Sequence, residues 1–148
     1  MVRALLFSLL ASLPALSVHA EVINIDNAEL ARLSAAGVPV IDIRTEGEWN
    51  ETGVVPGSRL ITLFDEKGRA DGRAWLEKVK AIAQPDKPVI VICRSGNRTT
   101  AASQFLSQEA GYKTVYNVKD GIRAWAKESR PLAPAASAVA TCPAGARC

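Results

Sequence analysis

The chain has 148 residues, of which 48% are hydrophobic, so it is long enough for one compact domain and too short for two comfortable ones. Its 18 Lys and Arg residues exceed its 15 Asp and Glu residues by only three, and no Lys/Arg block is present, which argues against a nucleic-acid partner. The 5% aromatic content and the 8 prolines indicate neither a base-stacking platform nor a disordered chain.

The first 20 residues have the pattern of a secretory signal peptide. Arg3 precedes an apolar run over residues 4–16, and Val18 and Ala20 are the small residues that a signal peptidase reads. The run is shorter than the about 20 apolar residues that a membrane-spanning helix needs. We therefore expect export, to the periplasm in a bacterium with two membranes, with cleavage after Ala20 and no membrane attachment afterwards.

Cleavage would also remove His19, the only histidine of the chain. A mature chain without imidazole cannot contain a Ser-His-Asp triad, a Cys-His pair or a His-ligated metal site. We expect no metal and no cofactor, and any nucleophile must be activated by other groups.

Strand and helix patterns then alternate along the chain. Apolar runs of strand length cover residues 22–25, 40–43, 59–63, 89–93 and 113–118. Helical spacing or capping signals cover residues 28–36, 45–49, 73–83, 99–110 and 121–127. The run 89–93 is β-branched and apolar on both faces, which is typical of a central strand in a parallel sheet. The alternation predicts a three-layer α/β domain.

From Pro131 onward the composition changes to Ala, Pro and Ser, which predicts a poorly ordered tail. We place the domain at residues 21–131 and the tail at residues 132–148. Cys142 and Cys148 lie in this tail and are a candidate disulfide in an oxidising compartment. In the alternative interpretation, the pair accepts sulfur or electrons from Cys93.

The polar loop after the predicted central strand carries the main chemical signal. It lies between the carboxyl end of a strand and the start of a helix, where backbone N–H groups and the helix terminus bind anions. The same field favours the thiolate of Cys93, and Arg94 and Arg98 add positive charge. We predict that Cys93 is a nucleophile, although a free Cys is often only a small buried residue. The predicted substrate-binding residues are Arg94, Ser95, Gly96, Asn97, Arg98 and Thr99.

These motifs resemble those of the single-domain rhodaneses, a family of sulfurtransferases. The resemblance covers about residues 22–132 and follows the family's order: Ile41-Asp42-Ile43-Arg44, Glu48-Trp49, Gly53, Pro56-Gly57-Ser58, the strand and loop 89–99, and Gly121 with Trp125. It implies a rhodanese-like three-layer fold, with a central parallel sheet of five strands flanked by helices. It also implies a cysteine that cycles through a persulfide.

The chain departs from the family pattern at two places. Val54-Val55 stands where a histidine and an apolar residue often precede Pro-Gly, and Asp120-Gly121 stands where paired glycines often precede the last helix. Both departures concern local turn geometry and leave the cysteine loop intact.

The resemblance implies a reaction in two halves. The Cys93 thiolate takes the outer sulfur of a small anionic donor, sulfite leaves, and cyanide or a thiol then removes the sulfur. A protein thiol is a further candidate acceptor. The two arginines favour thiosulfate over 3-mercaptopyruvate as the donor. Asp42 and Arg44 either support the pocket or form a structural ion pair, and the three tryptophans are expected in the core.

Two alternatives use the same residues differently. A cysteine-loop phosphatase or arsenate reductase would hold an oxyanion in the loop, but one residue fewer than in those loops separates Cys93 from Arg98. The smaller ring suits a sulfur atom better than a phosphoryl group. The other alternative is a non-catalytic binding module on the rhodanese scaffold, and the intact cysteine loop argues against it.

Overall fold

The computed structural model describes residues 20–139, which fold around one five-stranded sheet in the order β1-β5-β4-β2-β3. All its pairings are parallel. The predicted β-branched strand is the central one, β4. The predicted signal peptide lies outside the described residues except for Ala20, and so do Cys142 and Cys148. The strands are β1 (Glu21–Ile25), β2 (Val40–Asp42), β3 (Arg59–Leu60), β4 (Val89–Ile92) and β5 (Thr114–Val118).

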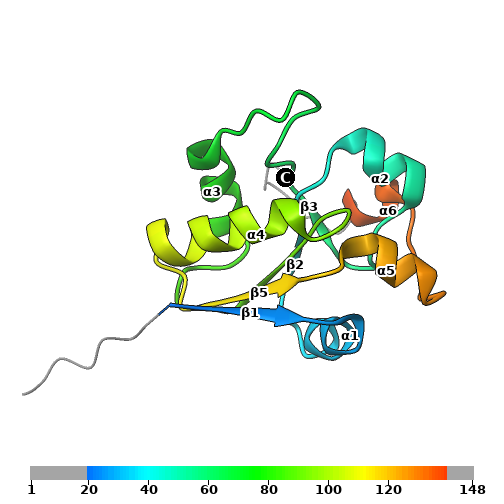
Figure 1. The fold of residues 1–148 in the computed structure, drawn as a ribbon, viewed down its shortest axis with the longest axis horizontal. Helices are drawn as coiled ribbons and strands as arrows, with labels where there is room; N and C mark the ends of the chain where they lie inside the picture. The colour runs from blue at the N-terminus through cyan, green and yellow to red at the C-terminus, as the bar shows by residue number, and fades with distance from the viewer. Residues whose placement is uncertain (1–19, 140–148) are drawn as a thin grey trace, which may run out of the picture.

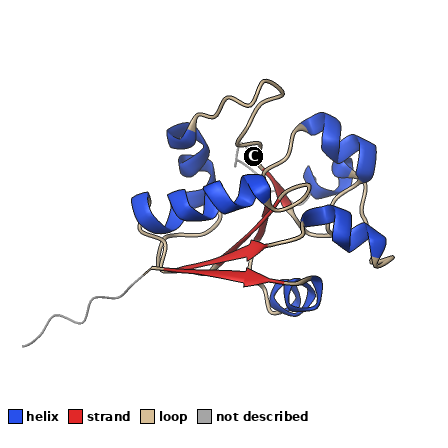
Figure 2. Cartoon of the chain, viewed as in Figure 1, coloured by secondary structure: helices blue, strands red, loops and turns tan. Residues whose placement is uncertain are grey.

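Helices lie on both faces of the sheet, as Figures 1 and 2 show, so the three-layer α/β prediction is confirmed. Among the described residues, none of the helices combines the length and the apolar character that crossing a bilayer requires. The helices are α1 (Asn27–Ala35), α2 (Glu46–Thr52), α3 (Gly72–Lys80), α4 (Asn97–Gln104), the π-helix η1 (Phe105–Glu109), α5 (Gly121–Lys127) and α6 (Ala135–Val139).

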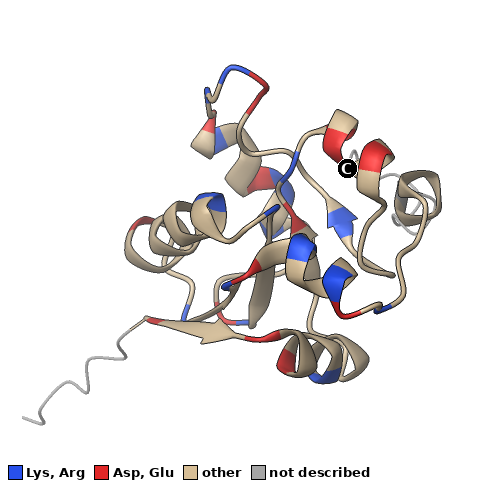
Figure 3. Ribbon diagram, turned by 45° about the vertical axis from the view of Figure 1, so that its right-hand side comes forward, with Lys and Arg blue, Asp and Glu red and all other residues tan. Residues whose placement is uncertain are grey.

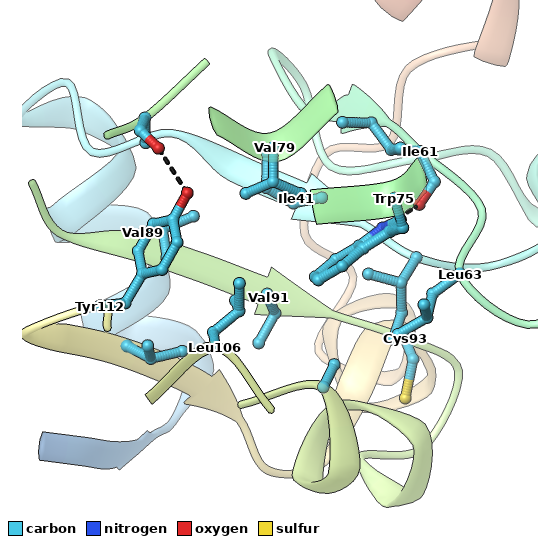
Figure 4. Packing of buried hydrophobic residues seen from close by; sticks show 14 residues of the cluster. Ile41, Ile61, Leu63, Trp75, Val79, Val89, Val91, Cys93, Leu106 and Tyr112 are labelled. Atoms are coloured by element: carbon cyan, nitrogen blue, oxygen red, sulfur yellow. Dashed lines mark hydrogen bonds between the residues drawn. The ribbon is translucent and has the colours of Figure 1, made fainter. Parts of the chain in front are cut away.

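The strands bury both faces, as expected of a parallel sheet. Alternate residues of β4 belong to two clusters: Val89 and Val91 pack with α3 and α4, and Ile90 and Ile92 pack with α1 and α5. Figure 4 shows the first cluster, in which the Trp75 indole donates a hydrogen bond of 3.0 Å to the Ile61 carbonyl oxygen. All three tryptophans are buried, as predicted: Trp49, Trp75 and Trp125.

Local signals account for how α2 begins and ends. The predicted capping box is present, because the Thr45 hydroxyl accepts from the Glu48 amide and the Glu48 carboxylate accepts from the Thr45 amide. The helix continues beyond the predicted end at Trp49 to Thr52, and Gly53, with φ of 75°, ends it.

Besides α2, other elements differ from their predicted bounds, most clearly β3 and the helix that begins with α4. β3 has two residues instead of five. Beyond it, the pairing with β2 continues only as isolated backbone hydrogen bonds, from the amides of Ile61 and Leu63 to the carbonyl oxygens of Asp42 and Ile43. The predicted helix over residues 99–110 begins earlier and widens into η1, where the Ala110 amide donates to the Phe105 carbonyl oxygen at 3.0 Å.

The predicted poorly ordered tail is wrong for residues 132–139. Val54 and Ala133 exchange backbone hydrogen bonds of 2.9 and 2.8 Å, and Ala135 and Ala138 of α6 are buried against Trp49. Small side chains allow this close packing, which the composition alone does not reveal. The segment thus covers Val54, at the first departure from the family pattern, and contacts the edge strand β3.

Candidate active site

Cys93 directly follows β4, and its side chain lies at the edge of the core cluster in Figure 4. The Gly96 amide donates a hydrogen bond of 3.2 Å to its Sγ atom, and the Thr99 hydroxyl lies 3.7 Å from the same sulfur. That hydroxyl also donates to the Gly96 carbonyl oxygen at 2.8 Å. The chain therefore curls around the sulfur at the start of α4, and an N–H donor at this position stabilises a thiolate.

The first turn of α5 packs against this loop, backbone against backbone. The amides of Ile122 and Arg123 donate to the carbonyl oxygens of Cys93 and Arg94, at 2.8 and 3.2 Å. Gly121 has φ of 63°, and a Cβ atom there would lie 2.5 Å from the Arg94 carbonyl oxygen. Gly96 has the same constraint, since its Cβ would lie 1.9 Å from the Lys119 carbonyl oxygen. The missing Cβ atoms thus permit the contact that fixes the loop.

The second departure from the family pattern is tolerated here. Asp120 has φ of −106°, which any residue adopts, and its side chain is exposed. The requirement for glycine falls on Gly121 alone, so the chain keeps the turn geometry that the loop needs.

Arg98 is tied to α2 by a two-pronged ion pair. Its Nη1 and Nη2 atoms donate to the two carboxylate oxygens of Glu48 at 2.8 and 2.6 Å. The Arg98 guanidinium and the Thr45 amide hold the pKa of Glu48 down, at about 2. Glu48 raises the pKa of Arg98, with a smaller contribution from the nearby Cys93. Arg98 thus lies near the thiol, but both of its Nη atoms already donate to the Glu48 carboxylate.

Sequence reasoning missed the part that Glu48 plays in this site. Its capping-box spacing with Thr45 indicated only a helix start, whereas the same carboxylate also anchors the cysteine loop through Arg98. The other loop side chains are exposed: those of Arg94, Ser95 and Asn97. The structure therefore brings Cys93, Gly96 and Thr99 together and leaves these three facing solvent.

Asp42 and Arg44 form a buried ion pair at the end of β2, the strand beside β4. The guanidinium donates to both oxygens of Asp42 and reaches the Thr52 hydroxyl at 2.7 Å and the Gly53 carbonyl oxygen at 2.9 Å. The pair thus joins the sheet to α2, which favours structural bracing over substrate binding. In the described part of the chain, no cluster of His, Cys, Asp and Glu could hold a metal.

Replacing Glu48 with Gln is expected to lower the free energy of unfolding at pH 7 by about 2 kcal/mol. The folded-state pKa of about 2 lies below the ordinary value of 4.5, so the ionised carboxylate stabilises the fold above about pH 5. This contribution disappears as the pH falls towards 2. Urea unfolding should therefore show a smaller stability difference between wild type and variant at pH 3 than at pH 7, with roughly half of it or less remaining.

The Glu29→Gln variant is the control for this measurement. Glu29 also pairs with an arginine, Arg32, at 2.6 Å, but both side chains are exposed. We expect a clearly smaller loss, because solvent screens an exposed pair. Equal losses in the two variants at pH 7, or a Glu48→Gln loss that is as large at pH 3 as at pH 7, would contradict the assignment of the Glu48 pair as an anchor.

Comparison with known proteins places this geometry in a family context. The family model described as "Rhodanese-like domain" matches residues 26–128. "Thiosulfate sulfurtransferase 18" of Arabidopsis thaliana is 31% identical over 116 residues, which are 76% of this chain and 84% of that protein.

Two solved structures extend the comparison. A rhodanese-related protein from Thermoplasma volcanium is 31% identical, with a TM-score of 0.57 over 75% of this chain and 97% of the other. A protein from Rhodopseudomonas palustris, described as of unknown function and a possible tyrosine phosphatase, is 27% identical, with a TM-score of 0.58 over 76% of this chain and 85% of the other.

Proposed function

Because the chain belongs to the rhodanese-like domain family, we propose that it is a sulfurtransferase whose Cys93 carries sulfur as a persulfide. The observation that carries the proposal is the hydrogen bond of 3.2 Å from the Gly96 amide to the Cys93 sulfur. This hydrogen bond belongs to a loop whose backbone lies against Gly121 of α5 and whose Arg98 side chain is paired with Glu48 of α2. Relatives named as sulfurtransferases agree with this chemistry.

In the first half-reaction, the Cys93 thiolate attacks the outer sulfur of thiosulfate. The sulfur–sulfur bond of the donor breaks, sulfite leaves with the electron pair, and Cys93 becomes a persulfide. The loop N–H groups and the amino end of α4 are suited to the negative charge of the donor and of the outer sulfur. In the second half-reaction, cyanide or a thiolate attacks the outer sulfur, and the Cys93 thiolate is released.

The phosphatase alternative is less well supported. A phosphoryl group in such a loop needs a free arginine fork to bind its oxygens. Both prongs of Arg98 point to Glu48, and the charge of Arg98 is thereby balanced. The description of the Rhodopseudomonas palustris structure as a possible tyrosine phosphatase is therefore no basis for assigning that activity here.

The proposal includes a compartment and partners. The n-terminal pattern around Arg3 and Ala20 supports export, after which the domain would act outside the cytoplasm. Its partners there would be a small anionic sulfur donor and a thiol or cyanide acceptor, with a protein thiol as a further candidate.

Intact-mass measurement after incubation with thiosulfate tests the persulfide directly. We expect a gain of about 32 Da that cyanide removes and that the Cys93→Ser variant does not show, because only a nucleophilic cysteine retains the sulfur. The double variant Cys142→Ser/Cys148→Ser is the matched control, and its gain and turnover should equal those of the wild type.

Three outcomes would count against parts of this proposal. A mass gain in Cys93→Ser would assign the sulfur to another residue. Loss of turnover in the Cys142→Ser/Cys148→Ser variant would establish the alternative in which the two tail cysteines relay sulfur. The absence of any adduct on the wild type would favour a non-catalytic binding module.

A further inference from the structure

A cavity of about 250 Å³ lies beside the cysteine loop, between α2 and α5. Arg94, the next residue after Cys93 in the chain, forms part of one wall, and Arg123 of α5 lines the same space. Glu51 lines it from α2. The cavity therefore borders the loop that carries Cys93, although Cys93 itself is not part of its lining.

The charges around this cavity leave a positive excess. Arg44 is balanced by Asp42, and Glu48 is balanced by Arg98. Within residues 20–139, the guanidinium groups of Arg94 and Arg123 form no ion pair, and neither does Glu51. Two unpaired cations against one unpaired anion favour a ligand that carries negative charge. Figure 3 shows the contrast between basic residues on α5 and acidic residues on α2.

The cavity also has an apolar part, formed by Ile122 and Ala126 of α5. Thiosulfate and cyanide have no carbon chain that could use such a surface. The volume corresponds to about eight water molecules at about 30 Å³ each, which exceeds what either ion needs. A small organic molecule with a short carbon chain and anionic groups matches both parts of the lining.

We propose that this cavity binds the sulfur acceptor, and that the acceptor is a small thiol that carries carboxylate groups. The proposal rests on the sulfurtransferase function. The carboxylates would pair with Arg94 and Arg123, and the carbon chain would lie on Ile122 and Ala126. This assigns the Arg94 side chain to the acceptor, whereas sequence reasoning gave it to the donor.

The chemical step is balanced without any further reactant. The acceptor thiolate attacks the outer sulfur of the Cys93 persulfide, and a new sulfur–sulfur bond forms. The bond between Sγ of Cys93 and the outer sulfur of the persulfide breaks, and its electron pair returns to Sγ as the thiolate. The acceptor leaves as a persulfide that still carries its carboxylates.

Acceptor selectivity in the Arg123→Ala variant tests the proposal. With thiosulfate as donor, we expect the KM for mercaptosuccinate to rise about tenfold, the effect of losing a charge-assisted hydrogen bond. The KM for 2-mercaptoethanol, a neutral thiol, should change much less, so the ratio of the two KM values is the readout. Arg123→Lys should restore part of the selectivity because it keeps the charge.

Lys127→Ala is the matched control for this experiment. It removes a positive charge from the last turn of the same helix, at a residue outside the cavity lining, so the KM ratio should not change. An equal rise for both thiols would overturn the proposal. A rise in the KM for thiosulfate instead would assign the cavity to the donor and would also overturn it.

A binding measurement separates this proposal from the sulfurtransferase function. Succinate carries the carboxylates without a thiol, so its binding does not depend on a persulfide. Titration of the labelled protein should shift the backbone amide resonances of Glu51, Arg94 and Arg123, and Arg123→Ala should abolish these shifts. If succinate leaves these resonances unchanged, the carboxylate site is refuted even where the persulfide forms. If succinate binds but no persulfide forms, the sulfurtransferase function fails, and with it the acceptor role of the cavity.

Discussion

Replacing Arg44 with Met is expected to lower the free energy of unfolding by about 4 kcal/mol. Arg44 and Asp42 are both fully buried, and the guanidinium supplies the charge that balances the Asp42 carboxylate. The substitution keeps most of the side-chain volume but leaves the buried Asp42 carboxylate with the backbone amide of residue 44, at 3.1 Å, as its remaining hydrogen-bond donor among the described residues. Urea-induced unfolding at pH 7 measures the loss.

The double variant Asp42→Leu/Arg44→Met identifies the source of this loss. Removing both charges eliminates the uncompensated carboxylate, so the double variant should be more stable than Arg44→Met alone. It should remain below the wild type, because the Thr52 hydroxyl and the Gly53 carbonyl oxygen lose a partner. If the double variant is no more stable than the single one, the loss comes from the contacts with α2, and the assignment of the ion pair is wrong.

Replacing Gly121 with Ala is expected to reduce sulfurtransferase turnover about 100-fold and to destabilise the fold by about 3 kcal/mol. The added Cβ would lie 2.5 Å from the carbonyl carbon and oxygen of Arg94, and 2.6 Å from the Cys93 carbonyl oxygen. These are backbone atoms of the loop, so the collision can be relieved only by moving the chain that positions the Cys93 sulfur. Steady-state kinetics and thermal unfolding of the same preparation measure both effects.

Gly111→Ala separates the collision from backbone strain. Gly111 has φ of 76°, close to the 63° of Gly121, but an added Cβ there meets nothing within 4 Å. Its substitution should cost about 1 kcal/mol from the left-handed conformation and should leave turnover unchanged. If Gly121→Ala behaved in the same way, the close approach of the turn to the loop would have no part in catalysis.

Signals confined to a short stretch of sequence predicted most of the fold. The β-branched run that ends at Ile92 gave the central strand, and the capping box of Thr45 and Glu48 gave the start of α2. The segment around Ala133 was misjudged because Ala and Pro dominate both disordered tails and this packed connection. What orders it is contact with Trp49 and Val54, which lie far away in the sequence.

The residues of the candidate site likewise divide into those that a local sequence pattern predicts and those that only the fold brings together. Cys93, Gly96 and Thr99 are neighbours in the sequence, so the loop motif predicted their meeting. Glu48 and Arg98 are 50 positions apart, and no local pattern indicates that a helix-capping carboxylate also holds a loop arginine. The acceptor cavity was likewise invisible, because Glu51, Arg94 and Arg123 converge on it from separate elements.

The order of the strands also has a consequence for how the domain folds. β1 pairs only with β5, and Glu21 stands opposite Thr114, so the first strand of the domain finds its partner in the last. Contacts between such distant segments require the closure of a long loop before they contribute energy, which slows folding. A chain emerging from the ribosome therefore cannot complete its sheet until β5 has been synthesised.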